Sequence, residues 1–95
     1  MVQVVENRTD LEGVVKSQTP QATGVVVLVV AVERATPVPG VADLLSQRVG
    51  SSLDVTAPAD RVPSDLTDQR IRFRARLAGP GVVRLDPAVP IARLP

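Results

Sequence analysis

The sequence predicts a mainly β domain, a small barrel of five strands with one short helix. Of its 95 residues, 44% are hydrophobic but only one is aromatic, so the core has to be built from Val, Leu, Ile and Ala. Side chains that branch at Cβ pack well on a pleated sheet and lose rotamer freedom in a helix. Several short segments also alternate apolar and polar residues with a period of two. A chain of this length forms one domain, which we expect over residues 1–86, followed by a proline-rich tail over 87–95.

The first third of the chain predicts three strands. A short apolar segment at residues 2–5 is followed, after a polar turn, by an expected strand over 11–17, in which Gly13 marks a bulge or a bend. The segment 25–32 is apolar at every position. This pattern favours a strand that is covered on both faces, either inside the barrel or by a second subunit. At eight residues it is well short of the roughly 20 that span a bilayer as a helix.

A short helix is expected in the middle of the chain. Residues 37–40 contain two prolines and a glycine, which end the preceding strand. Apolar residues then follow at helical spacing: Val41, Leu44, Leu45 and Val49. Gly50 stands where a left-handed C-terminal cap belongs, so the pattern predicts a helix over residues 41–48.

The last part of the chain predicts three strands and a tight turn. Apolar and polar residues alternate over 53–57, whereas 58–68 has no periodicity and is expected to be a loop. An alternating strand follows over 69–77. The sequence of residues 79–82, Gly-Pro-Gly-Val, suits a type II turn, with glycine where φ must be positive. Residues 82–85 should therefore pair back on the preceding strand as a hairpin.

One strand carries a stripe of arginines. Arg70, Arg72, Arg74 and Arg76 alternate with Ile71, Phe73, Ala75 and Leu77. Because successive side chains of a strand point to opposite faces, this segment should turn hydrocarbon groups inward and guanidinium groups outward. The four arginines are the candidate site for binding an anion or a nucleic acid.

Two interpretations of this stripe remain open. Guanidinium groups bind phosphate through two parallel hydrogen bonds, and alternate strand residues lie about 6.5 to 7 Å apart, close to the phosphate spacing of a single strand. Single-strand binders, however, usually stack bases on aromatic rings, and Phe73 is expected to face the core. Alternatively, the arginines form a solvated surface and pair with nearby carboxylates such as Asp54, Glu33 or Asp86.

The composition argues against an enzyme. Histidine and cysteine are absent, which removes the commonest general base, thiol nucleophiles and most zinc sites. Asp60, Asp65 and Asp68 could in principle hold Ca²⁺ or Mg²⁺, but their spacing fits no metal-binding loop and is typical of turns. We therefore expect neither a metal nor a cofactor. The net charge of +1 provides no overall field to attract polyanions, so any basic site must be local.

The order of the expected elements resembles the oligonucleotide/oligosaccharide-binding (OB) fold. A bent first strand with Gly13, an apolar second strand, a short third strand, a connector and a final hairpin follow one another. Residues 53–85 are similar to the third strand, connector and closing hairpin of small bacterial OB domains. The motifs that carry the similarity are Val55-x-x-Pro58, Val62-Pro63 and Arg70-Ile71-Arg72-Phe73-Arg74. The resemblance covers about residues 11–86 and implies a five-stranded Greek-key barrel.

Together these features predict a non-enzymatic binding or interaction module. A protein partner or self-association, as in a homodimer, is the preferred interpretation. The alternative is single-stranded nucleic-acid binding through Arg70, Arg72, Arg74 and Arg76. The N-terminal segment has no basic region followed by a long apolar run, so we expect a cytoplasmic protein that does not associate with membranes.

Overall fold

A computed structural model describes residues 6–95, and the strand expected at residues 2–5 lies outside the described residues. The strands are β1 (Thr9–Ala22), β2 (Val25–Pro37), β3 (Ser52–Pro58), β4 (Arg70–Gly79), β5 (Val82–Leu85) and β6 (Ala92–Arg93). Helical structure within residues 6–95 is limited to two single 3-10 turns, η1 (Ser46–Arg48) and η2 (Ala59–Arg61). The predicted mainly β fold is therefore confirmed.

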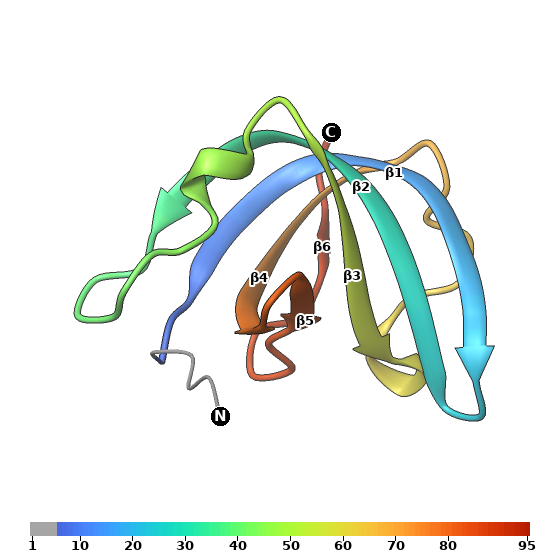
Figure 1. Ribbon diagram of the computed structural model, residues 1–95. Helices are drawn as coiled ribbons and strands as arrows, with labels where there is room; N and C mark the ends of the chain where they lie inside the picture. The colour runs from blue at the N-terminus through green and yellow to red at the C-terminus, as the bar shows by residue number, and fades with distance from the viewer. Residues whose placement is uncertain (1–5) are drawn as a thin grey trace.

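The first five strands close into a barrel. Their order is β1-β2-β3-β5-β4, and β4 pairs back on β1 (Figure 1). The pairing of β3 with β5 is parallel and short, with Val55 opposite Val83 and Thr56 opposite Arg84. The other strand pairs are antiparallel. This five-stranded closed barrel is compatible with an OB-like fold.

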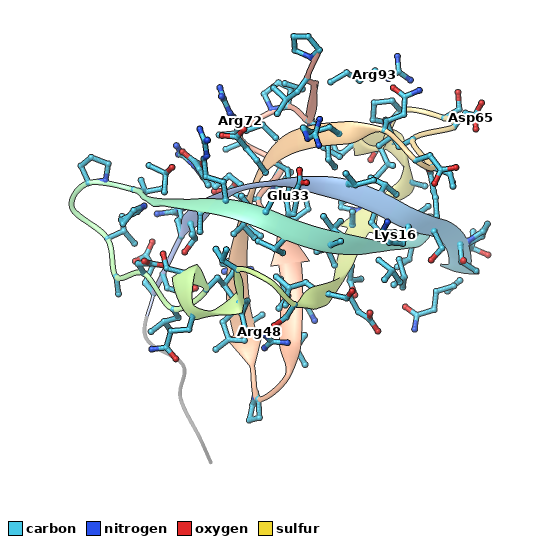
Figure 2. The ribbon with its side chains drawn as sticks, turned by 90° about the horizontal axis from the view of Figure 1, so that it is seen from above. Lys16, Glu33, Arg48, Asp65, Arg72 and Arg93 are labelled. Carbon is cyan, nitrogen blue, oxygen red and sulfur yellow. The ribbon has the colours of Figure 1, made fainter. Side chains whose placement is uncertain are left out.

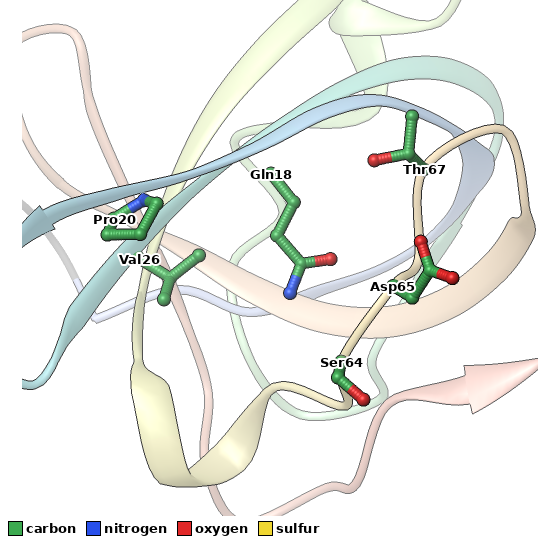
Figure 3. A pocket seen from close by; sticks show the side chains of 6 residues that line it. All are labelled: Gln18, Pro20, Val26, Ser64, Asp65 and Thr67. Carbon is green, nitrogen blue, oxygen red and sulfur yellow. The ribbon is translucent and has the colours of Figure 1, made fainter.

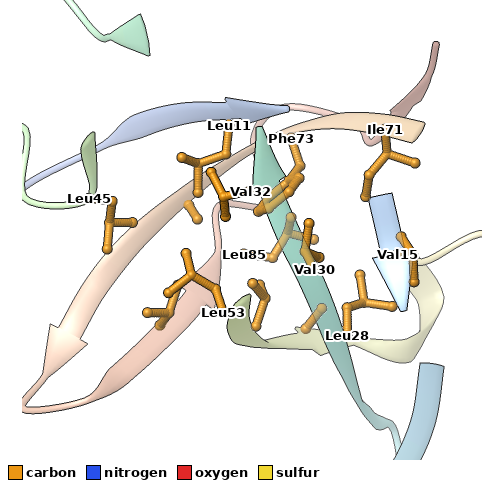
Figure 4. Close-up of a cluster of buried hydrophobic side chains, with 14 of the residues drawn as sticks. Leu11, Val15, Leu28, Val30, Val32, Leu45, Leu53, Ile71, Phe73 and Leu85 are labelled. Atoms are coloured by element: carbon orange, nitrogen blue, oxygen red, sulfur yellow. The ribbon is translucent and has the colours of Figure 1, made fainter. Parts of the chain in front are cut away.

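The core fills the inside of the barrel with aliphatic side chains around one ring. Phe73 is 1% exposed, and the inward residues of β2, Leu28 and Val30, are fully buried (Figure 4). Alternate residues of β2 on the outer face, Val27 and Val29, are only half-buried. The valine-rich segment is thus a core strand on one side, while this single chain leaves the other side partly open to solvent.

Gly13 lies where the backbones of β1 and β2 come close together. The register of β1 against β2 shifts between Glu12 and Gly13, so Glu33 of β2 is the extra residue of a β-bulge. A Cβ atom on Gly13 would lie 2.2 Å from the backbone oxygen of Ala31, a distance that no side chain tolerates. A bulge is thus present at Gly13, as predicted, but its extra residue is on β2, and the reason for glycine is this close approach of two backbones.

The helix expected over residues 41–48 is reduced to η1. The carboxylate of Asp43 accepts hydrogen bonds from the backbone N–H groups of Leu45 and Ser46, at 3.2 and 3.1 Å from Oδ1, and from the Ser46 hydroxyl. Such local side-chain bonds compete with helical ones. Leu45 is buried in the core, whereas Leu44 and Val49 are 40% and 46% exposed. Of the four apolar residues at helical spacing, one is buried, Val41 is half-buried and two are exposed, so they do not form one helix face.

Residues 87–95, which the sequence suggested as a tail, lie against the barrel. Their short strand β6 pairs with β4 at Ile71 and Arg72. The backbone N–H of Leu94 donates to the carbonyl of Arg70 at 2.9 Å, and Ile91 packs against the core. This segment covers the part of β4 that β5 does not reach.

The connector between η2 and β4 is fixed by one side chain of β1. The Gln18 amide donates to the carbonyl of Pro63 and accepts from the N–H of Leu66, both at 3.0 Å. Leu66 is fully buried beneath this contact. Asp65 and Asp68 adopt φ angles of 64° and 67°, so they act as turn residues.

Residues 6–95 contain no helix that is both long and apolar enough to cross a membrane.

Candidate functional site: the arginines of strand β4

The arginine segment is an extended strand with the predicted orientation. Ile71, Phe73 and Ala75 are buried, whereas Arg70, Arg72 and Arg76 are exposed and Arg74 is half-buried. Two different neighbours flank this strand. Residues 70–75 of β4 pair with β1, and residues 75–79 pair with β5. The four arginines therefore divide between two environments.

Arg70, at the start of β4, is held by a carboxylate of β2. Its Nε lies 2.7 Å from Glu33 Oε1 and its Nη2 lies 3.2 Å from Oε2, so the two side chains meet through two parallel bonds. Glu33, labelled in Figure 2, is the bulge residue of β2. Its side chain reaches across β1 to Arg70 of β4. The Arg70 hydrogen bond lowers the pKa of Glu33, and the same contact raises the pKa of Arg70.

Arg72 and Arg74 face carboxylates directly across the β1–β4 pairing. Arg74 Nε lies 2.8 Å from Asp10 Oδ1, and this hydrogen bond raises the pKa of Arg74. Arg72 Nη2 lies 3.5 Å from Glu12 Oε2, at the outer limit of a hydrogen bond. Register explains both pairs, since Asp10 is opposite Arg74 and Glu12 is opposite Arg72. We call Arg70, Arg72 and Arg74 the paired arginines.

Arg76 differs from the other three. It lies directly opposite Arg84 of β5, and both side chains are exposed on the outer face. Within residues 6–95 neither of them forms an ion pair. Like charges at directly opposite positions of two strands repel each other and destabilise the pairing. We call Arg76 and Arg84 the unpaired arginines.

The unpaired arginines border a groove of about 360 Å³. The residues that line it are Gly24, Val25, Thr56, Ala57, Pro58, Arg76, Arg84 and Leu85. They come from the β1–β2 turn, the start of β2, strand β4 and the ends of β3 and β5, where the parallel pairing of β3 and β5 stops after Thr56 and Arg84. The walls are mainly aliphatic, and the two guanidinium groups supply the charge. A groove of this composition suits a ligand with an apolar part next to an anion.

Another hollow, of about 310 Å³, lies beside the connector and includes Gln18, Pro20 and Asp65 (Figure 3). The Gln18 amide in this hollow already binds the backbone at Pro63 and Leu66, so this side chain serves the fold. The described part of the chain contains no group of three or more acidic side chains arranged to hold a metal ion. The groove next to the unpaired arginines is therefore the better candidate site.

The partners of the paired arginines were foreseen only in part. Glu33 is such a partner, as suggested. Asp86 pairs with Arg8 at 3.0 Å, and Asp54 makes no ion pair among residues 6–95. Arg84 was missed as a site residue, and the tight turn at 79–82 would not have identified it. Counting back from that turn places Arg84 opposite Leu77, whereas the structure has a register shift at Ala78 that places Arg84 opposite Arg76.

Comparison with protein-family models, with curated proteins and with solved structures found no match to this chain. The function is therefore argued from the geometry of the barrel and of the groove.

Proposed function

We propose that this protein is a non-enzymatic binding module with an OB-type barrel, and that it binds a segment of a partner protein in the groove beside Arg76 and Arg84. The OB assignment is supported by the closed order β1-β2-β3-β5-β4 and by the parallel β3–β5 contact. It is also supported by the irregular register between the first two strands, where Glu33 of β2 and Lys16 of β1 have no partner.

One observation carries the proposal. Three arginines of the outer face are neutralised by carboxylates, whereas two adjacent ones are not, and these two border the groove. Evolved sequences satisfy local rules of charge and pairing throughout the fold, and violations concentrate at functional sites. An unneutralised pair of like charges next to aliphatic walls is such a violation.

The second candidate is a single-stranded nucleic acid that lies across the same groove. It is favoured by the adjacent guanidinium groups of Arg76 and Arg84, which suit phosphates. Single-strand binding also relies on aromatic platforms on which bases stack. The residues that line the groove are not aromatic, and Phe73, the one aromatic residue of the sequence, is buried. A peptide is therefore the preferred ligand.

Titration of ¹⁵N-labelled protein tests where a ligand binds. The first probe is a capped heptapeptide of alternating Val and Glu, and the second is an oligothymidylate of about 12 nucleotides. We expect the peptide to shift the amide signals of Gly24, Thr56 and Arg84, while those of Lys16 and Arg93 stay in place. Shifts spread evenly over the barrel, or no shift with either probe, would contradict the proposal.

The same samples separate the remaining interpretations. Tighter binding of the oligonucleotide than of the peptide, with a steep salt dependence between roughly 50 and 200 mM, would favour the nucleic-acid alternative. Light scattering of the free protein measures self-association. A stable dimer whose groove signals no longer respond to the peptide would identify a second copy as the occupant of the groove.

A further inference from the structure

We infer that Arg76 and Arg84 form a carboxylate-binding site, and that the partner segment presents an acidic side chain flanked by an apolar one. This inference rests on the proposed function and specifies the chemistry of its ligand. It concerns the two unpaired arginines and the row of outward side chains that they share with Thr56.

Electrostatic repulsion between the unpaired arginines favours the binding of an anion. Arg76 and Arg84 are the outward residues of a directly opposed pair on β4 and β5, and neither has a carboxylate partner within residues 6–95. The repulsion between them is relieved when one anion lies between them, so binding gains both attraction and relief of strain. A neutral ligand would obtain neither.

The spacing of the unpaired arginines suits a single carboxylate. Opposite residues of an antiparallel pair have Cβ atoms about 4.5 to 5.5 Å apart, so the two guanidinium groups can converge on one carboxylate, one to each oxygen. Thr56 lies next to Arg84 across the parallel pairing, which places its hydroxyl group in the same row. Three polar groups from three strands therefore face the same side of the sheet.

Aliphatic side chains flank the place that the anion would occupy. Val25 and Pro58 are opposite each other across β2 and β3, are not buried, and both line the groove. Val27 continues this apolar surface, since it lies opposite Thr56 and is half-buried. An aliphatic side chain next to the acidic one would cover these walls, which an isolated phosphate or acetate cannot do.

The experiment measures affinity by fluorescence anisotropy at roughly 50 mM salt. The probes are the labelled Val/Glu heptapeptide and its counterpart with Gln at each Glu position. The variants are Arg76→Gln, Arg84→Gln and the double variant. The matched control is Arg72→Gln, because Arg72 is exposed on the same strand and is paired with Glu12.

We expect the Glu peptide to bind at least about tenfold more tightly than the Gln peptide, as charge-assisted hydrogen bonds imply. Each single substitution should weaken the Glu peptide about fivefold to tenfold. The double variant should bind both peptides equally, and Arg72→Gln should stay within about twofold of the parent. Thermal melting of each variant checks that the barrel remains folded.

Different failures lead to different conclusions. Equal binding of the Glu and Gln peptides by the parent protein would overturn the carboxylate site but leave the groove as a binding surface. Equal losses in Arg72→Gln and Arg84→Gln would overturn it as well, because they would indicate a general charge effect. Binding of neither peptide would contradict the carboxylate site and the proposed function together.

Discussion

The two halves of β4 present the same residue type on the same face and yet differ in electrostatic character. In residues 70–75 the neighbour is β1, which offers Glu12 to Arg72 and Asp10 to Arg74, while Glu33 of β2 reaches across β1 to Arg70. In residues 75–79 the neighbour is β5, which offers Arg84. An arginine stripe therefore has no fixed meaning by itself, because the surrounding strands decide whether each charge is neutralised or available.

The changeover between the two halves lies at Ala75. This buried residue is opposite Thr9, the first residue of β1, and also opposite Leu85, the last residue of β5. Thr9 is itself fully buried, and its hydroxyl donates to Asp43 Oδ1 at 2.6 Å. The boundary between paired and unpaired arginines is thus set by where β1 is anchored.

The largest expected effect comes from a substitution where β1 and β2 approach each other most closely, beside the paired arginines. Gly13→Ala should destabilise the protein by about 3 kcal/mol or more, because the new methyl group would overlap the backbone oxygen of Ala31. Gly79→Ala is the control, since its Cβ would meet Val82 only at an ordinary 3.8 Å. Urea denaturation measures both. Equal stability of the two variants would show that the bulge does not depend on glycine.

A smaller loss of stability is expected at the boundary between the paired and the unpaired arginines. Asp43→Ala should cost about 2 kcal/mol, because the buried Thr9 hydroxyl and two backbone N–H groups lose their acceptor. Chemical denaturation at neutral pH measures this loss. A cost below about 0.5 kcal/mol would mean that β1 is anchored by other contacts.

The lowered pKa of Asp43 predicts how the stability of the fold depends on pH under acidic conditions. Burial opposes the ionisation of Asp43, but hydrogen bonds from Ser46, Thr9 and backbone N–H groups outweigh it and lower its pKa below 3.8. A group with a lowered pKa stabilises the fold fully above its unfolded pKa. This contribution is lost as the pH falls below 3.8 and through the folded pKa. Denaturation of Asp43→Ala across this range should lack that part of the acid dependence, and an unchanged profile would contradict the assignment.

The smallest expected effect is the change in stability when one arginine is replaced by threonine, and its sign differs between the unpaired and the paired arginines. Arg84→Thr should stabilise the protein by about 0.5 kcal/mol, since it removes a like-charge contact with Arg76 and suits a strand. Arg74→Thr should not stabilise it, because it removes the ion pair with Asp10. Thermal melting of the two variants at low salt measures both changes in stability. A stabilising effect of equal size at both positions would reduce the comparison to strand propensity.

The sequence predicted the features of β4 that depend on local order. Alternation placed Phe73 inside and the arginines outside, and the Gly-Pro-Gly turn predicted the hairpin with β5. Closure of β1 on β4 joins Asp10 to Arg74 and Glu12 to Arg72, which are 64 and 60 positions apart, so these partners could not be identified from local patterns. The helix expected over 41–48 failed for a local reason, because Asp43 competes for the backbone N–H groups that a helix would use.

The arginine side-chain Nε–Hε signals of ¹⁵N-labelled protein, followed while the Val/Glu heptapeptide is added, test the central claim most directly. The account predicts that the signals of Arg76 and Arg84 move with the same affinity as the groove amides, while those of Arg70 and Arg74 remain in place because Glu33 and Asp10 already occupy them. Movement of Arg70 and Arg74 with Arg76 and Arg84 unchanged would contradict it.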